Sequence, residues 1–199
     1  MREHARYRWI ALCAGLLLLF GTATLERTPS AARLIPGVGA GQRGSAESAL
    51  ERGVVAALAA KAPRLDQALS SRIAASIARC QREQSLPPDL VLAVLMQESS
   101  GRPGARSPKG AIGLMQVMPH MYEVLALPGG VAHVEANIEA GCRLLADNIS
   151  RLGEERGIST YFWGTTGGND TYLRGVQKLR QDLRPYLDGE AEGATPVSG

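Results

Sequence analysis

The chain has 199 residues, 45% of them hydrophobic, which is enough for one domain of ordinary size with a real core. Its formal net charge is +3, and residues 1–23 carry +2 of it, so the remainder carries only +1. That is too little for a basic stripe that follows a phosphate backbone, and we do not expect nucleic acid as a partner.

The first 25 residues have the pattern of an export signal. A short segment with three arginines precedes an uncharged run at residues 9–25, and Gly21 and Ala23 offer a cleavage site. The run is close to the roughly 20 residues that a membrane span needs, so an uncleaved inner-membrane anchor is the alternative. A buried helix of a cytosolic protein is a third interpretation, which the arginines disfavour. We expect a periplasmic protein, exported by this segment or tethered by it.

Residues 26–62 are interpreted as a linker with a short helix. Leu50, Val54 and Leu58 have helical spacing within residues 46–61, and Pro63 ends the pattern. The sequence leaves open whether this helix docks on the domain or projects from the linker. The glycine-rich residues 37–44 follow no predicted strand, so we do not interpret them as a nucleotide-binding loop.

The domain itself is placed at residues 63–187 and is expected to be mainly α. Residues 90–96 are apolar on all sides, which predicts a helix buried all around. No alternating pattern of useful length predicts a strand. The expected helices cover residues 65–84, 87–99, 134–152 and 172–187 (the last interrupted by Pro185), with loops at 101–110 and 164–170 and a disordered tail at 188–199.

Two cysteines remain once the leader is set aside, Cys80 and Cys142. An oxidising compartment permits a disulfide between them, and packing of the helices at 65–84 and 134–152 brings them within bonding range. Two separate, buried thiols are the alternative, because spacing alone does not prove a bond.

The most informative segment, residues 98–119, reads ESSGRPGARSPKGAIGLMQVMP. Glu98 closes the apolar helix, a loop of Gly, Pro and Ser follows, and a second apolar turn carries Gln116. A lone carboxylate where the core meets a polar loop is expected to have a raised pKa. Such a group suits acid catalysis of glycosidic bond cleavage at neutral pH.

These residues resemble the catalytic SLT domain of family 1 (soluble-type) lytic transglycosylases, which has a goose-type lysozyme-like fold. The resemblance spans about residues 70–180. It rests on Glu98-Ser99, Ser107, Gly113-Leu114-Met115-Gln116 and Met118-Pro119, with a second block at Asn137-Ile138, Gly141 and Leu144-Leu145 that resembles the family's helix supporting the cleft.

The resemblance implies that Glu98 is the sole catalytic acid and base. It would protonate the oxygen between N-acetylmuramic acid and N-acetylglucosamine in peptidoglycan, then accept the proton of the muramyl C6 hydroxyl as a 1,6-anhydro ring closes. The nucleophile belongs to the substrate, so no second carboxylate is needed, unlike in most glycosidases. No cofactor or metal is expected, and His120 and His133 match no ligand pattern.

The resemblance also implies sugar contacts by Ser107 and Gln116, a cleft-lining role for Met118, and a tyrosine near the acid. Tyr161 and Tyr172 match the family's tyrosine positions, but Phe162 replaces the family's asparagine, and the connection to Tyr172 is short. Trp163 is a candidate for stacking on a sugar ring. The alternatives are a turn serine, an amide that only ties down its loop, core methionines and packed aromatic rings.

Two other functions remain open from the sequence. One is a lysozyme-type hydrolase on the same fold, and the other is a non-catalytic glycan-binding assembly factor. The small size and missing accessory domains also resemble transglycosylases that open the wall for secretion, pilus or conjugation machinery, which would then be a partner.

Overall fold

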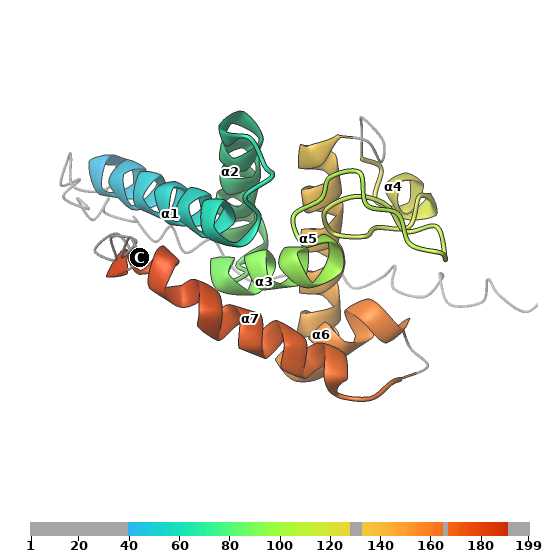
Figure 1. The fold of residues 1–199 in the computed structure, drawn as a ribbon. Coiled ribbons are helices and arrows are strands. Elements are labelled where there is room, and N and C mark those ends of the chain that lie inside the picture. The colour runs from blue at the N-terminus through green and yellow to red at the C-terminus, as the bar shows by residue number, and fades with distance from the viewer. Residues whose placement is uncertain (1–39, 128–132, 165–166, 191–199) are drawn as a thin grey trace, which may run out of the picture. The chain divides into compact units, whose positions relative to one another are not determined.

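The structure, a computed structural model, describes residues 40–127, 133–164 and 167–190 (Figure 1). These residues form helices joined by loops, without a β-strand, so the prediction of a mainly α fold is confirmed. The predicted leader or tether at residues 1–25 and residues 191–199 of the predicted tail lie outside the described residues. The helices are α1 (Ala40–Lys61), α2 (Gln67–Gln84), α3 (Pro88–Ser99), α4 (His120–Val124), α5 (Val134–Leu152), α6 (Glu154–Trp163) and α7 (Thr171–Leu187).

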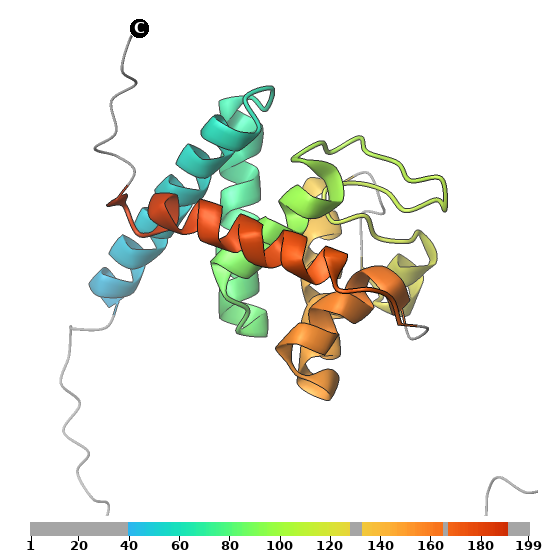
Figure 2. The same ribbon diagram turned by 60° about the horizontal axis from the view of Figure 1, so that its bottom comes forward.

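Helix α3 is the centre of the core. Every side chain from residue 90 to residue 95 is fully buried, as the unbroken apolar run predicted. Pro88 occupies the first turn, where its missing N–H needs no partner. Helices α2 and α7 pack on α3, and α7 passes next to α3 in both views of the molecule (Figures 1 and 2). The last turn of α3 reaches the surface beside the start of α7.

Helix α1 docks on the domain, which the sequence left open. It packs on α2 and α7 and buries Val54, Ala57 and Leu58 in the core. A Cβ atom on Gly53 would lie 2.6 Å from the carbonyl oxygen of Tyr186, so glycine is what permits this close approach. The helix begins at Ala40 rather than at the predicted residue 46. Glycines near its start weaken the helical signal in the sequence, because glycine costs about 1 kcal/mol relative to alanine inside a helix.

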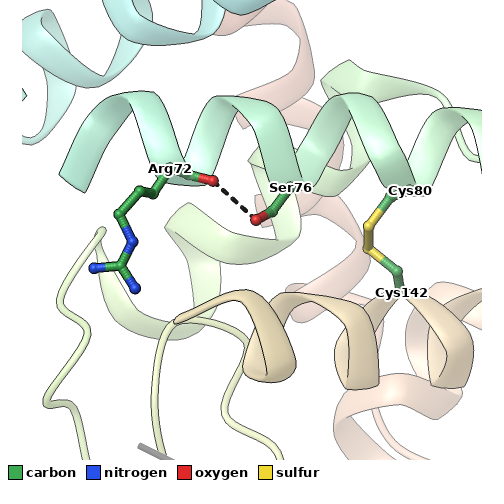
Figure 3. Close-up of a disulfide and its surroundings, with 4 residues drawn as sticks. All are labelled: Arg72, Ser76, Cys80 and Cys142. Atoms are coloured by element: carbon green, nitrogen blue, oxygen red, sulfur yellow. Dashed lines mark hydrogen bonds between the residues drawn. A yellow bond between two sulfur atoms is a disulfide. The ribbon is translucent and has the colours of Figure 1, made fainter. Parts of the chain in front are cut away.

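Helices α2 and α5 are joined covalently and by an ion pair. Cys80 and Cys142 form a disulfide with their Cα atoms 6.0 Å apart (Figure 3). Two turns before Cys80, Arg72 donates to Glu135 at 2.7 Å. Asp66 caps α2 by accepting from the N–H of Leu69 at 2.7 Å. The bounds of α5 are those that the sequence predicted, and α5 supports the loops before it.

Two helices were not predicted, and the interruption predicted at Pro185 in the last helix was wrong. Helix α6 follows α5 after Gly153, and a Cβ atom on its Gly157 would lie 2.7 Å from the backbone of Ile149. A ten-residue helix with a central glycine gives a weak periodic signal, so close packing decides its existence. Helix α4 is a single short helix after Pro119. Pro185 lies inside α7 without interrupting it, two residues before the helix ends at Leu187, and removes one backbone N–H donor there.

Within the residues that the structure describes, no helix combines the length and apolar character needed to cross a membrane.

Candidate active site

Glu98 lies in the last turn of α3, where the buried helix meets the surface. Its neighbours Met96 and Ser99 are buried, whereas Gln97 and Ser100 are exposed, and Glu98 itself is half-buried. The hydroxyl of Tyr172 donates a hydrogen bond to its Oε1 atom at 2.6 Å. The carboxyl group is therefore neither sealed in the core nor spread into open solvent.

Burial raises the pKa of Glu98 to about 7, against the opposing effect of the hydrogen bond from Tyr172. Desolvation disfavours the charged form of a carboxyl group, whereas a donated hydrogen bond favours it. The carboxyl also lies at the C-terminal end of a helix, where the helix dipole disfavours negative charge. At neutral pH about half of these groups hold a proton, as an acid catalyst requires.

Tyr172 reaches Glu98 because α7 approaches α3 closely. Gly175, one turn after Tyr172, contacts Gln97, and a Cβ atom there would lie 2.8 Å from its Oε1 atom. Val176 on the same face of α7 is fully buried. Burial and the charge of Glu98 raise the pKa of Tyr172 far above its ordinary value, so its hydroxyl remains a donor at any physiological pH.

The other carboxylates near the motif in sequence are engaged elsewhere or exposed. Glu123 on α4 is exposed. Three acids have arginine partners: Asp89 with Arg180 and Arg184, Glu135 with Arg72, and Glu139 with Arg143. Across residues 40–127, 133–164 and 167–190, no group of three His, Cys, Asp or Glu side chains is arranged to hold a metal ion.

The loop after Glu98 is held by side chains that the sequence singled out. The side-chain amide of Gln116 donates to the carbonyl oxygens of Ala105 at 3.1 Å and Gly113 at 3.0 Å. The Ser107 hydroxyl oxygen accepts the N–H of Ala111 at 3.0 Å and closes the turn between them. Both side chains therefore have a structural role in this loop, which leaves their sugar contacts a prediction.

Asn137 of α5 joins this loop to the helix behind it. Its Oδ1 accepts the N–H of Met115 at 2.8 Å, and its Nδ2 donates to the carbonyl of Ile112 and to the hydroxyl of Tyr122. A Cβ atom on Gly113 would lie 2.5 Å from this Nδ2. The sequence analysis placed Asn137 on the supporting helix. It did not predict Tyr122 as a partner of Asn137, because no local sequence pattern indicates that contact.

Three of the five predicted sugar-binding residues meet around one surface hollow of about 200 Å³. Gln116, Met118 and Tyr161 line it together with residues of α4 and α5. Tyr161 donates its hydroxyl to the carbonyl of Met115 at 2.8 Å, and the charge of Glu98 contributes to raising its pKa. Tyr161 thus lines the hollow and lies within electrostatic range of Glu98. Ser107 and Tyr172 are not among the residues around this hollow.

Phe162 and Trp163, the two aromatic residues at the end of α6, contact other side chains of the protein. The ring of Phe162 stacks on that of Tyr172 with centroids 4.6 Å apart, and Trp163 contacts Phe162 edge-on at 4.8 Å. Trp163 also donates its indole N–H to the carbonyl oxygen of Asn169 at 3.1 Å. The stacking of Phe162 on Tyr172 is a feature of the site that the sequence did not predict.

The site thus consists of a half-buried acid at the end of α3, a tyrosine of α7 that donates to it, and a following loop that Asn137 of α5 braces. The sequence model of the transglycosylase SLT domain matches residues 75–175, about half of the chain and the part that holds this arrangement. The chain belongs to that family, and the resemblance stated from its sequence is confirmed.

Individual proteins of similar sequence are named as transglycosylases. The chain is 35% identical over 134 residues to a transglycosylase of Enterobacteria phage PRD1, covering 62% of this chain and 50% of the phage protein. It is 31% identical over 114 residues to the soluble lytic murein transglycosylase of Escherichia coli, covering 53% of this chain and 18% of that protein. The chain thus spans half or less of these relatives.

A solved structure of an inactive mutant of the lytic transglycosylase Slt from Pseudomonas aeruginosa is also similar. The sequence identity is 19% and the TM-score 0.42, over 63% of this chain and 25% of that one. At this distance the likeness bears on neither mechanism nor substrate.

Proposed function

We propose that this protein is a lytic transglycosylase that cuts peptidoglycan glycan strands, with Glu98 as its catalytic acid and base. The observation that carries the proposal is the half-buried carboxyl of Glu98, which has a pKa of about 7 and accepts a hydrogen bond from a neutral partner, Tyr172. Membership of the SLT family supports the reaction and the substrate class.

The proposed reaction runs through one proton on one side chain. The Glu98 carboxylic acid donates its proton to the oxygen between N-acetylmuramic acid and N-acetylglucosamine, and the bond from that oxygen to the muramyl C1 breaks. Positive charge then builds on C1. The Glu98 carboxylate accepts the proton of the C6 hydroxyl as O6 bonds to C1, which closes the 1,6-anhydro ring and restores the acid.

Each surrounding group has a place in this scheme. The hydroxyl of Tyr172 keeps one carboxyl oxygen in position and stabilises the carboxylate between the two proton transfers. Gln116, Met118 and Tyr161 form a wall against which a sugar unit can lie. Ser107 is the weaker candidate for a sugar contact, because its hydroxyl oxygen already accepts a backbone N–H. No step requires a metal or a cofactor.

A hydrolase on the same scaffold is the nearest alternative, and the products separate the two. Purified protein is incubated with peptidoglycan sacculi in water enriched in heavy oxygen, and the released fragments are analysed by mass spectrometry. We expect anhydromuramyl ends without the label. Labelled reducing ends, heavier by one water, would instead identify a hydrolase.

A non-catalytic glycan-binding factor is the alternative from another class. It predicts sacculus binding without release of fragments, in the parent protein and in Glu98→Gln alike. The variant Glu123→Gln is a matched control, because it removes one exposed carboxylate near the site without touching Glu98. Release by the parent and by Glu123→Gln, but not by Glu98→Gln, would exclude this alternative.

The proposal includes a cell-envelope location, since the substrate lies there. We further propose export to the periplasm by residues 1–25, with cleavage or retention as an inner-membrane tether. A role in opening the wall for a secretion, pilus or conjugation apparatus is part of the same proposal. Fractionation of cells that express the full chain with a C-terminal tag tests the location, and cytosolic protein of full length would contradict it.

A further inference from the structure

Phe162 is unusual in being a large aromatic side chain that is 51% exposed at the edge of the candidate active site. It lies near the C-terminal end of α6, one residue before Trp163. Single exposed apolar side chains are common on protein surfaces, so the contacts of Phe162, rather than its exposure, indicate a role. Its ring contacts Tyr172, the residue that donates to Glu98.

The ring of Phe162 lies nearly parallel to that of Tyr172, with an interplanar angle of 14° and centroids 4.6 Å apart. The rest of Tyr172 is buried, with 4% of the residue exposed. Phe162 therefore covers one face of the ring whose hydroxyl donates to Glu98. Rotation of Tyr172 away from the carboxyl would have to break this stack.

Phe162 also contacts a second aromatic ring, that of Trp163. Trp163 meets it edge-on, with an interplanar angle of 88°, and Trp163 is tied by its indole N–H to Asn169. A Cβ atom on Gly168 would lie 2.2 Å from the indole, so that loop packs directly on the ring. A continuous set of contacts leads from the loop between α6 and α7 through Phe162 and Tyr172 to Glu98.

We propose that Phe162 is a positioning residue, which acts by holding the hydroxyl of Tyr172 on the carboxyl group of Glu98. The inference rests on the proposed function for its catalytic consequence but not for its structural content. Aromatic pairs of this geometry contribute enough to bias the orientation of a ring, which corresponds to about a two- to tenfold effect on an equilibrium or a rate.

The alternative explanation is that Phe162 only shields Glu98 from water. The two explanations predict opposite changes in the pKa of Glu98 when Phe162 is replaced. If Phe162 holds Tyr172, its loss weakens a hydrogen bond to the carboxylate and raises the pKa of Glu98 further. If Phe162 only excludes water, its loss lowers that pKa, since burial is the larger cause of the shift. Among the described residues, Tyr172 of α7 is the titratable group that shifts the pKa of Glu98. The charge of Glu98 in turn raises the pKa of Tyr161 of α6, and Tyr161 remains unchanged in the variants used.

The test measures the pKa of Glu98 directly, by NMR titration of protein labelled with carbon-13 in its glutamate carboxyl groups. The signal is assigned by its loss in Glu98→Gln. We expect a higher pKa in Phe162→Leu than in the parent, in the same direction as in Tyr172→Phe. Phe162→Tyr keeps the stacked ring and is expected to match the parent.

The double variant decides whether the effect passes through the hydroxyl. In a Tyr172→Phe background, Phe162→Leu is expected to change the pKa of Glu98 no further. A fall or no change in Phe162→Leu, or an equal rise in both backgrounds, overturns the proposal. Circular dichroism verifies folding, and Phe162→Met replaces Phe162→Leu if the latter unfolds.

Turnover supplies the second readout. Phe162→Leu is expected to lower kcat on sacculi about two- to tenfold, and Phe162→Tyr to restore it. An unchanged kcat would overturn the catalytic consequence. If the parent protein released nothing from sacculi, the proposed function would fail, whereas the titration would still test whether Phe162 holds Tyr172.

Discussion

Helix α3 carries a carboxylate near each end, and the two have opposite surroundings. Asp89, in the first turn, contacts Arg180 at 3.0 Å and Arg184 at 3.2 Å. Glu98, in the last turn, has a neutral hydroxyl as its partner. The helix dipole favours negative charge at the first position and disfavours it at the second.

The comparison shows how one buried helix provides two kinds of acid. Asp89 pairs with Arg180 and Arg184 and so joins α3 to α7, and Arg180 also donates to Glu154 of α6. Glu98 keeps a proton near neutral pH because burial is not offset by a cation. Position on the helix and choice of partner, rather than residue type, separate this structural carboxylate from the one proposed to be catalytic.

The largest expected effect is a loss of activity on substitution of Glu98 that substitution of Asp89 does not produce. Glu98→Gln should lower release of fragments from sacculi by about 10²- to 10⁴-fold, because the amide cannot donate the required proton. Asp89→Asn should retain activity when assayed well below its unfolding temperature. Loss of activity in a folded Asp89→Asn variant, or retention in Glu98→Gln, would break the comparison.

The pH dependence of kcat/KM should report the proton on Glu98. Because the protonated form starts the reaction and its pKa is about 7, we expect a plateau below that pH. Above it, kcat/KM should fall about tenfold per pH unit. A rate that stays level up to pH 9 would mean that a different group supplies the proton.

Substitution of Glu98 should raise the stability of the protein at alkaline pH although it lowers activity. The pKa is raised from 4.5 in the unfolded chain to about 7 in the folded protein, so the folded state binds the proton more tightly. This stabilisation is fully present below pH 4.5 and is lost as the pH rises through 7. At pH 8, Glu98→Gln should therefore be more stable than the parent, by at most about 3 kcal/mol since the carboxyl is partly solvated.

Denaturant unfolding at pH 5 and pH 8 measures this difference. At pH 5 Glu98→Gln should exceed the parent in stability by only about 1 kcal/mol or less, because Glu98 is protonated in the folded state and partly ionised in the unfolded chain. Equal stability at pH 8 would indicate that burial of the carboxyl is weaker than its pKa implies.

The smallest expected effect is a change in stability on substitution of Asp89, at the start of α3. Asp89→Asn should lower the free energy of unfolding by about 1–3 kcal/mol, because Arg180, with only 14% of its side chain exposed, loses a charged partner. Urea denaturation measures the change. The exposed pair of Lys178 and Asp182 is the matched control, and Asp182→Asn should leave stability unchanged within error.

Sequence reasoning succeeded where the relevant information is local. The unbroken apolar run predicted that residues 90–96 are buried, and helical spacing predicted α5 from end to end. The position of Glu98 at the edge of the core follows from the same pattern, because a helix that is apolar all round must change character where it leaves the core. The family itself was recognisable from the closely spaced residues around Glu98.

The resemblance implied a tyrosine near Glu98, and only the tertiary structure decided which tyrosine donates to the acid and which other residues lie around it. Tyr172 lies 74 positions from Glu98 in the chain, and the stacking of Phe162 on Tyr172 depends on how α6 and α7 meet. Docking of α1 and the existence of α6 depend on close contacts at Gly53 and Gly157. Periodicity determines which face of a helix is apolar, but not which other face it meets, because that choice depends on the shape and packing of the whole core.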